Sequence, residues 1–154
     1  MHGLREVKHR HAVLIVTVTC LLLSGCSQTE QPGQICDAGR RAATSGGSTE
    51  AIETWEKKAL DTTPKEKLRA VMTCLRDSGL ATSDVDAAGW IVRVADKSHG
   101  RASLYAGMLY ASGAGLPADR GVARKYLEEA RSAAPDDAAA MLRVLDTVEG
   151  AASK

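Results

Sequence analysis

The sequence lacks phenylalanine altogether, and its aromatic side chains are restricted to two tryptophans and three tyrosines. Sheets favour β-branched and aromatic residues, whereas a core of alanine, leucine, valine and methionine suits closely packed helices. The chain also lacks an excess of either charge, since 20 lysines and arginines face 19 aspartates and glutamates. This balance gives no reason to expect a nucleic acid or an acidic substrate as partner. The 154 residues are therefore expected to form one all-α domain.

A hydrophobic run long enough to cross a membrane is missing as well. Mostly apolar residues extend over 12–23, and Arg5, Lys8 and Arg10 precede them. At about 1.5 Å per residue, such a run reaches roughly 18 Å as a helix, well short of a hydrocarbon core of about 30 Å. A basic segment followed by a short apolar one is typical of a secretory signal peptide, which we assign to residues 1–25.

The end of this leader resembles the lipobox of bacterial lipoproteins. The residues that carry the resemblance are Leu23-Ser24-Gly25-Cys26. The resemblance implies that the Cys26 sulfur receives a diacylglyceryl group, that the leader is cleaved before Cys26, and that fatty acyl chains such as palmitate anchor the mature protein. Ser27 implies the periplasmic face of the outer membrane, provided that the cell is Gram-negative. The alternative is an ordinary secretory signal with an incidental cysteine.

Cysteine and histidine are scarce in the remaining chain. Of 4 cysteines, Cys20 leaves with the leader and Cys26 takes the lipid. An even number in an oxidising compartment predicts a disulfide between Cys36 and Cys74. Closing this loop of about 39 residues is worth roughly 4 kcal/mol in the chain-entropy description. Two separate buried thiols are the alternative. Because only His99 survives cleavage, we expect no metal site and no cofactor.

Polar composition and helix signals divide the mature chain. Residues 26–34 are predicted to be a flexible tether, and 35–154 a helical repeat domain. Thr63 and Glu66 form a capping box with proline between them, and Gly79 is expected to end the helix that they start. Other helices are expected over about 36–43, 50–60, 84–97 and 137–148.

The clearest repeat-like pattern lies in residues 101–134, where two amphipathic segments flank a Gly-Ala-Gly-Leu-Pro turn. Small residues such as Gly107 allow the two helices to pack closely. The pattern Ala106-Gly-x-x-Tyr110, the turn Gly113-x-Gly-Leu-Pro117 with Asp119, and the later Ala123, Tyr126 and Leu127 resemble the Sel-one-like repeat, a relative of the tetratricopeptide repeat. The resemblance spans about 34 residues and implies a short right-handed α-solenoid of antiparallel helix pairs. Ala106 and Leu116 stand where the family usually has leucine and valine.

No catalytic motif accompanies these helices. The sequence has no Gly-x-Ser-x-Gly elbow, no phosphate loop of the Walker type and no His-Glu-x-x-His. His99 stands at a repeat junction, where the family often has a turn histidine. The neighbours Glu128 and Glu129 point about 100° apart on a helix, so they are poorly placed to share a substrate. We therefore expect no catalytic residues, and a small hydrolase is the disfavoured alternative.

The repeat family implies an adaptor with a concave protein-binding surface. We expect a membrane-anchored periplasmic lipoprotein whose partner is an envelope or periplasmic protein, such as a secretion-system component or a toxin. Tyr110 lies off the main apolar stripe and is the expected partner-facing residue, whereas Tyr105 and Tyr126 are expected in the helix seam. The alternatives are an immunity protein that neutralises a toxin delivered into the periplasm, for example a phospholipase, and a structural lipoprotein bound to the cell wall.

Overall fold

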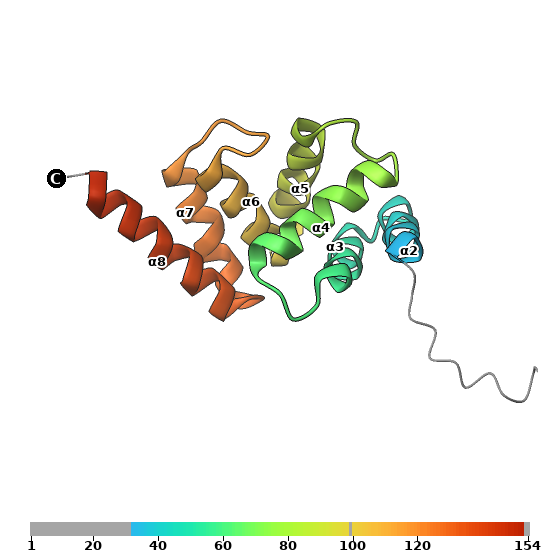
Figure 1. The fold of residues 1–154 in the computed structure, drawn as a ribbon, viewed down its shortest axis with the longest axis horizontal. Helices are drawn as coiled ribbons and strands as arrows, with labels where there is room; N and C mark the ends of the chain where they lie inside the picture. The colour runs from blue at the N-terminus through green and yellow to red at the C-terminus, as the bar shows by residue number, and fades with distance from the viewer. Residues whose placement is uncertain (1–31, 99, 153–154) are drawn as a thin grey trace, which may run out of the picture. The chain divides into compact units, whose positions relative to one another are not determined.

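Seven α-helices make up most of the part of the chain that the computed structural model describes, residues 32–98 and 100–152 (Figure 1). No strand occurs in this part, which confirms the all-α prediction. All of it belongs to one compact unit. The predicted signal peptide, the predicted lipid attachment at Cys26, and His99 lie outside the described residues.

Short connections place consecutive helices side by side. The elements are α2 (Pro32–Thr44), α3 (Ser48–Glu56), η1 (Lys57–Ala59), α4 (Pro64–Asp77), α5 (Asp84–Ser98), α6 (Arg101–Ser112), α7 (Arg120–Glu129), η2 (Ala130–Ser132) and α8 (Pro135–Ala152), where η marks a single 3-10 turn. Each α-helix packs against the next one, and α2 also contacts α4 while α6 also contacts α8. The helices thus follow one another in space in their order along the chain (Figure 1).

The local start and stop signals are confirmed. The Thr63 hydroxyl accepts a hydrogen bond from the Glu66 amide, and the Glu66 carboxylate accepts one from the Thr63 amide at 3.1 Å. Gly79 follows α4 with a φ of 72°, in the left-handed region where glycine is favoured. The Asp119 carboxylate accepts a hydrogen bond of 2.9 Å from the Val122 amide and so caps α7.

Two predicted boundaries differ from the structure. The tether was expected to continue to residue 34, but α2 begins at Pro32. Proline suits a helix start, because its φ is already helical and its missing N–H would have no partner there. The last helix was expected to end near residue 148, but α8 continues to Ala152. Its final turn is held by Glu149, whose carboxylate accepts a hydrogen bond of 2.7 Å from Arg124 of α7.

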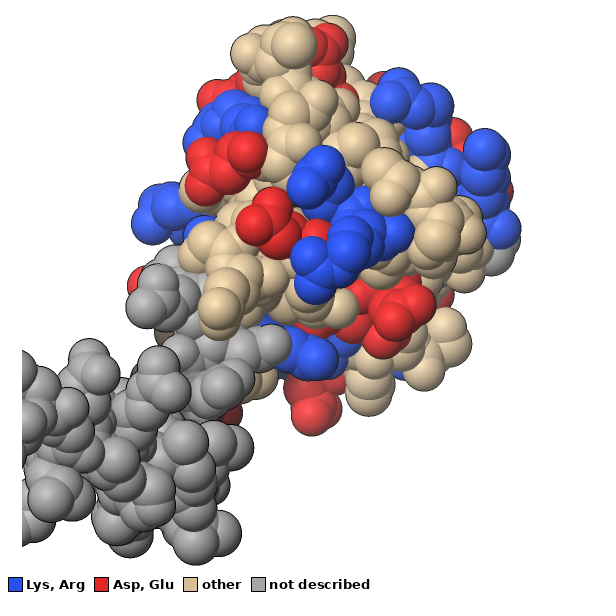
Figure 2. All heavy atoms as spheres, turned by 90° about the vertical axis from the view of Figure 1, so that its right-hand side faces the viewer, with Lys and Arg blue, Asp and Glu red and all other residues tan. Residues whose placement is uncertain are grey.

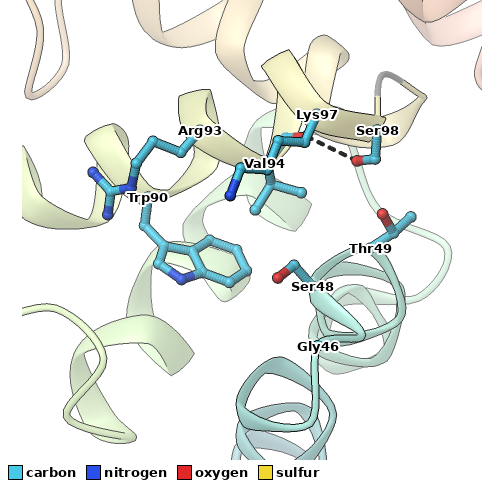
Figure 3. A pocket seen from close by; sticks show the side chains of 8 residues that line it. All are labelled: Gly46, Ser48, Thr49, Trp90, Arg93, Val94, Lys97 and Ser98. Atoms are coloured by element: carbon cyan, nitrogen blue, oxygen red, sulfur yellow. Dashed lines mark hydrogen bonds between the residues drawn. The ribbon is translucent and has the colours of Figure 1, made fainter.

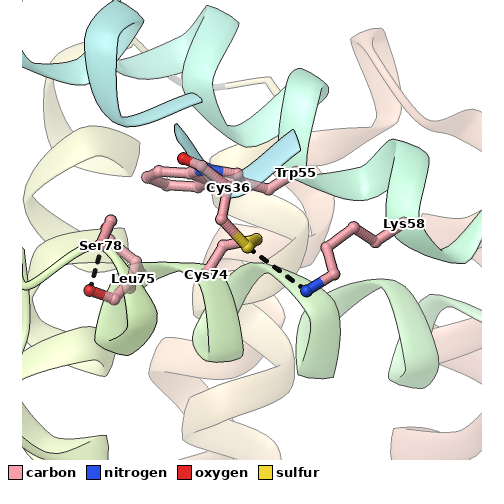
Figure 4. Close-up of a disulfide and its surroundings, with 6 residues drawn as sticks. All are labelled: Cys36, Trp55, Lys58, Cys74, Leu75 and Ser78. Atoms are coloured by element: carbon pink, nitrogen blue, oxygen red, sulfur yellow. Dashed lines mark hydrogen bonds between the residues drawn. A yellow bond between two sulfur atoms is a disulfide. The ribbon is translucent and has the colours of Figure 1, made fainter. Parts of the chain in front are cut away.

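A disulfide joins Cys36 of α2 to Cys74 of α4, as the cysteine count predicted (Figure 4). The two Cα atoms are 4.9 Å apart, and both side chains are buried. The fully buried Trp55 lies beside the bridge, and its indole N–H donates a hydrogen bond of 3.1 Å to the Cys36 carbonyl. The bridge, α3 and the tryptophan therefore form one packed layer at this end of the domain.

Helix α6 lies at the centre of the domain, and every residue from Ala102 to Leu109 is buried. Its closest neighbour is α7. A Cβ atom on Gly107 would lie 2.7 Å from Leu127 Cγ and 3.0 Å from the Ala123 carbonyl oxygen. Gly107 is therefore required for the close approach of these two helices, as the run of small residues predicted.

We expect Gly107→Ala to lower the free energy of unfolding by about 1–3 kcal/mol, because the new methyl group would meet a side chain and a backbone carbonyl of α7. The matched control is Gly89→Ala in α5, where the nearest atom is the flexible end of Arg93 at 3.5 Å. This control should raise the same free energy by about 0.4–1 kcal/mol through the entropy of the unfolded chain. Urea titrations followed by circular dichroism measure both. A stabilised Gly107→Ala protein would contradict the close approach.

Candidate protein-binding groove

A mostly apolar groove of about 810 Å³ opens between α4 and α8, with α6 between them. In Figure 1, α4 is drawn in green, α8 in red and α6 in gold, and these three helices contribute most of the lining. The lining residues are Lys65, Leu68, Arg69, Met72, Thr73 and Arg76 of α4, Met108, Leu109, Ala111 and Ser112 of α6, Ala114 and Gly115 of the following turn, Asp84 of α5, and Met141 and Val144 of α8. The groove is therefore built from helices that are far apart in the sequence.

Methionine is concentrated in this groove. Of the 4 methionines in the chain, Met72, Met108 and Met141 line it, and the fourth is the initiator residue. Unbranched thioether side chains adapt to irregular apolar surfaces and are over-represented at binding surfaces of variable shape. Val144 lies on the same surface with 55% of its area exposed. Val144 therefore adds exposed apolar area to the groove that the methionines line.

The α4 wall of the groove carries positive charge. Lys65, Arg69 and Arg76 lie on the same helix face as Leu68 and Met72, at spacings of three, four and seven residues. Arg76 is neutralised, because it forms an ion pair with Asp84, which also lines the groove.

The other two cations of this wall have no such partner. Lys65 and Arg69 are exposed, and neither forms an ion pair within residues 32–98 and 100–152. The opposite wall, formed by Met141 and Val144 of α8, is apolar. The groove is therefore apolar in the middle and on one side, with two uncompensated cations on the other.

A largely buried polar cluster links the start of α8 to α3 and α6. The Tyr105 hydroxyl of α6 donates a hydrogen bond of 2.5 Å to Glu56 Oε1 of α3. Arg101 Nε lies 3.3 Å from Glu56 Oε2, and Arg101 Nη1 lies 3.8 Å from Asp137 Oδ2 in the first turn of α8. The three helices are thus tied together by charge and hydrogen bonding where they meet.

Burial controls the protonation of this cluster. It raises the pKa of Glu56 above its ordinary value, against the opposing effects of the Tyr105 hydrogen bond and the Arg101 charge. Burial and the Glu56 carboxylate also raise the pKa of Tyr105, so that its hydroxyl stays a donor. The Glu56 carboxylate and the arginine beside it thus link helices to each other, and no group of three or more potential metal ligands is found in the described part of the chain.

A second, smaller pocket of about 210 Å³ lies between the start of α3 and the outer side of α5 (Figure 3). Trp90, Arg93 and Lys97 of α5 face Ser48 and Thr49 of α3 across it. The pocket shares no lining residue with the groove. Its size suits a small group and not a protein segment, so the groove is the candidate protein-binding site.

The predicted partner-facing residue Tyr110 lies in neither concavity. Its ring is half-buried and stacks on Tyr126, with ring centroids 5.8 Å apart. The Tyr126 hydroxyl donates a hydrogen bond of 2.5 Å to Asp96 of α5, which holds the pair in place. A role of Tyr110 in partner binding stays a prediction. Tyr105 and Tyr126 are buried, as expected for the helix seam.

The apolar residues of α4 differ in how far they are enclosed. Val71 and Leu75 are fully buried, Met72 is buried with 8% of its area exposed, and Leu68 is half-buried; Leu68 and Met72 also line the groove. In the sequence, Leu68 and Met72 share a helix face with Lys65. An apolar stripe that includes a lysine is a sign that the stripe extends to the surface.

Basic and acidic side chains are mixed on the face of the molecule that Figure 2 shows. On this face, lysine and arginine side chains lie close to aspartate and glutamate side chains. Some opposite charges of the domain form exposed ion pairs. An example is Arg40 with Asp37, whose Nη2 and Oδ1 atoms are 3.7 Å apart. This surface does not favour a highly charged partner, in agreement with a formal net charge of +1 for the whole chain.

The comparisons with known proteins gave no match: no family model fits the chain, and neither the curated proteins nor the solved structures compared with it include a similar one. The resemblances to the lipobox and to the Sel-one-like repeat therefore rest on the sequence motifs alone. Within residues 32–98 and 100–152, no helix combines the length and the apolar character that crossing a bilayer requires.

The raised pKa of Glu56 predicts how the stability of the cluster depends on pH. A raised pKa means that the folded state holds the Glu56 proton more tightly than the unfolded state does, so protonation of Glu56 stabilises the fold. This stabilisation is complete below the pKa of the unfolded state and is lost as the pH rises through the pKa of the folded state. The Tyr105 hydrogen bond acts in the opposite direction, because it stabilises the ionised carboxylate.

We therefore expect Tyr105→Phe to lower the free energy of unfolding by about 1.5–3 kcal/mol at neutral pH and by less near pH 4. Urea titrations at the two pH values measure the difference. Tyr126→Phe is the matched control, because Asp96 is exposed and water replaces the lost donor, so its effect should be small at both pH values. Equal losses for Tyr105→Phe at both pH values would contradict a charge-dependent bond to Glu56.

Proposed function

We propose that the chain is a lipid-anchored periplasmic protein that binds a partner protein in the groove between α4 and α8. The observation that carries the proposal is the groove itself, whose mainly apolar lining includes Val144 with 55% of its area exposed. The proposal has no catalytic step, and the chain acts by holding its partner at the membrane.

The residue types in the groove favour a protein partner. Interfaces between proteins are enriched in methionine and arginine and depleted in glutamate, aspartate and lysine at their centre. Met72, Met108 and Met141 line the groove here, and the cations Lys65 and Arg69 lie on its α4 wall. The groove is larger and more open than the pocket beside Trp90, so a segment of a folded protein can enter it without rearrangement of the helices.

We also propose that the fold is a short α-solenoid of Sel-one-like helix pairs. The position of the groove supports this proposal. Its main walls and floor come from α4, α6 and α8, which are every second helix of the chain. A stack of antiparallel helix pairs places alternate helices on one surface in this way. The close α6–α7 contact at Gly107 supports the assignment of residues 101–134 as the best-matching repeat.

Two features support the proposed location. The lipobox resemblance at Cys26 implies an acyl anchor, and the domain needs one because its net charge is too small to hold it on a membrane. The disulfide between Cys36 and Cys74 favours an oxidising compartment such as the periplasm, since cytosolic thiols are kept reduced.

The lipid anchor is tested by mass spectrometry of the native protein. We expect the mature chain to begin at Cys26 with acyl groups attached, and Cys26→Ser to remain uncleaved and free of acyl groups. An unmodified Cys26 sulfur, or a leader still attached to the native protein, would contradict the anchor and with it the proposed location.

The groove is tested with a photo-crosslinking amino acid placed at one of two exposed valines. Val144 lies in the groove with 55% of its area exposed, and Val85 lies outside it with 62% exposed. In the native cells, we expect benzoylphenylalanine at position 144 to give one discrete crosslinked product and position 85 to give none. Equal crosslinking from both positions, or none from 144, would contradict a groove-bound partner.

The identity of the crosslinked partner then separates the roles that remain open. A single toxin-like protein supports an immunity role, components of a secretion system support an accessory role, and recovery of glycan without protein contradicts the adaptor proposal.

A further inference from the structure

We propose that the partner segment in the groove is an amphipathic α-helix with acidic side chains one turn apart beside its apolar stripe. This inference rests on the proposed function and specifies the chemistry of the same groove. Three observations carry it: the apolar lining, the length of the α4 wall, and the two unpaired cations on that wall.

The lining favours a helix over an extended peptide. An extended segment brings its backbone N–H and C=O groups into the groove, and each of them needs a partner when water is removed. The middle of the groove offers few, because its lining is mainly methionine, leucine, valine and alanine. The Ser112 hydroxyl is already used, since it donates a hydrogen bond of 2.8 Å to the Met108 carbonyl. A helix satisfies its own backbone and presents only side chains.

The α4 wall has the dimensions of a helix-binding surface. Its groove-facing residues run from Lys65 to Arg76, and at about 1.5 Å per residue this face is roughly 16 Å long. Three turns of a partner helix cover that length. Methionine side chains at Met72, Met108 and Met141 adapt to the shape of the apolar residues that such a helix inserts.

Charge decides which helix fits. Lys65 and Arg69 are four residues apart, so their charged ends lie about one helical turn from each other. Neither has a carboxylate partner in the part of the chain that the structure describes. The facing wall on α8 is apolar at Met141 and Val144. A partner helix is therefore expected to carry two carboxylates one turn apart on the flank toward α4, and none on the flank toward α8.

The test measures binding of three synthetic peptides to the full mature protein in detergent by fluorescence anisotropy. The first is a side-chain-stapled helix with a leucine stripe and two glutamates four residues apart. The second has lysine in place of both glutamates. The third keeps the composition of the first but contains prolines that hold it extended. We expect the glutamate helix to bind roughly tenfold more tightly than the lysine helix, and the extended peptide not to bind.

Paired charge reversals locate the preference. In the double variant Lys65→Glu and Arg69→Glu, the lysine helix should bind more tightly than the glutamate helix. The matched control is Arg93→Glu combined with Lys97→Glu, two basic residues at the same spacing on α5 that line the other pocket. This control should leave the preference unchanged. High salt should reduce the preference of the unmodified protein, because both cations are exposed to solvent.

Several results would overturn the inference. They are equal binding of the two helical peptides, binding of the extended peptide, absence of binding by all three, or an equal effect of the α5 control. A dimer of the unmodified protein that Val144→Glu dissociates in sedimentation would also overturn it, because the occupant would then be a second copy of the chain. The photo-crosslink at position 144 reports on the proposed function independently, so a crosslinked partner together with failed peptide binding contradicts only the acidic helix.

Discussion

The enclosure of α6 is the constraint on which the rest of the structure depends. All residues from Ala102 to Leu109 are buried, because α3, α5, α7 and α8 all pack against this one helix. A helix in that position needs small residues where a neighbour comes close and large ones where a gap must be filled. Gly107 meets the first need against α7, and Met108 meets the second at the base of the groove. The groove is therefore a consequence of how α6 is surrounded.

Local signals in the sequence were sufficient to predict most of the helices, because the start and end of a helix depend on a few neighbouring residues. The capping box at Thr63 is of this kind. The disulfide between Cys36 and Cys74 is not local, but it could be predicted because only these two cysteines remain after the predicted leader and the predicted lipid site are set aside. The Glu56 cluster could not be predicted, since a glutamate in a helix is usually solvated and its partner Tyr105 lies 49 residues away. The groove was missed for a similar reason. Met108 follows Met72 by 36 residues and Met141 follows Met108 by 33, and such separations give no sign in the sequence that the three side chains line one groove.

Tyr110 shows how the enclosure of α6 affects a residue off the apolar stripe. A residue off the apolar stripe of a surface helix is expected to face solvent or a partner. On a helix that is surrounded, however, a second face is also covered, and Tyr110 stacks there on Tyr126. The surface that stays open is set by the gap between α4 and α8. Where a central helix is buried on several sides, a partner-binding surface is better sought on the helices that flank it.

The proposed anchor and the proposed groove are connected through the disulfide. Cys26 and Pro32 are six residues apart, so the described domain lies no more than about 20 Å of chain from an acyl anchor at Cys26. The chain enters the domain at α2, and the bridge from Cys36 to Cys74 fastens α2 directly to α4, the basic wall of the groove. In this arrangement, a force applied at the proposed anchor reaches α4 through the disulfide as well as through the packing of the helices. If the proposed anchor is present, this covalent link connects it to the basic wall of the groove.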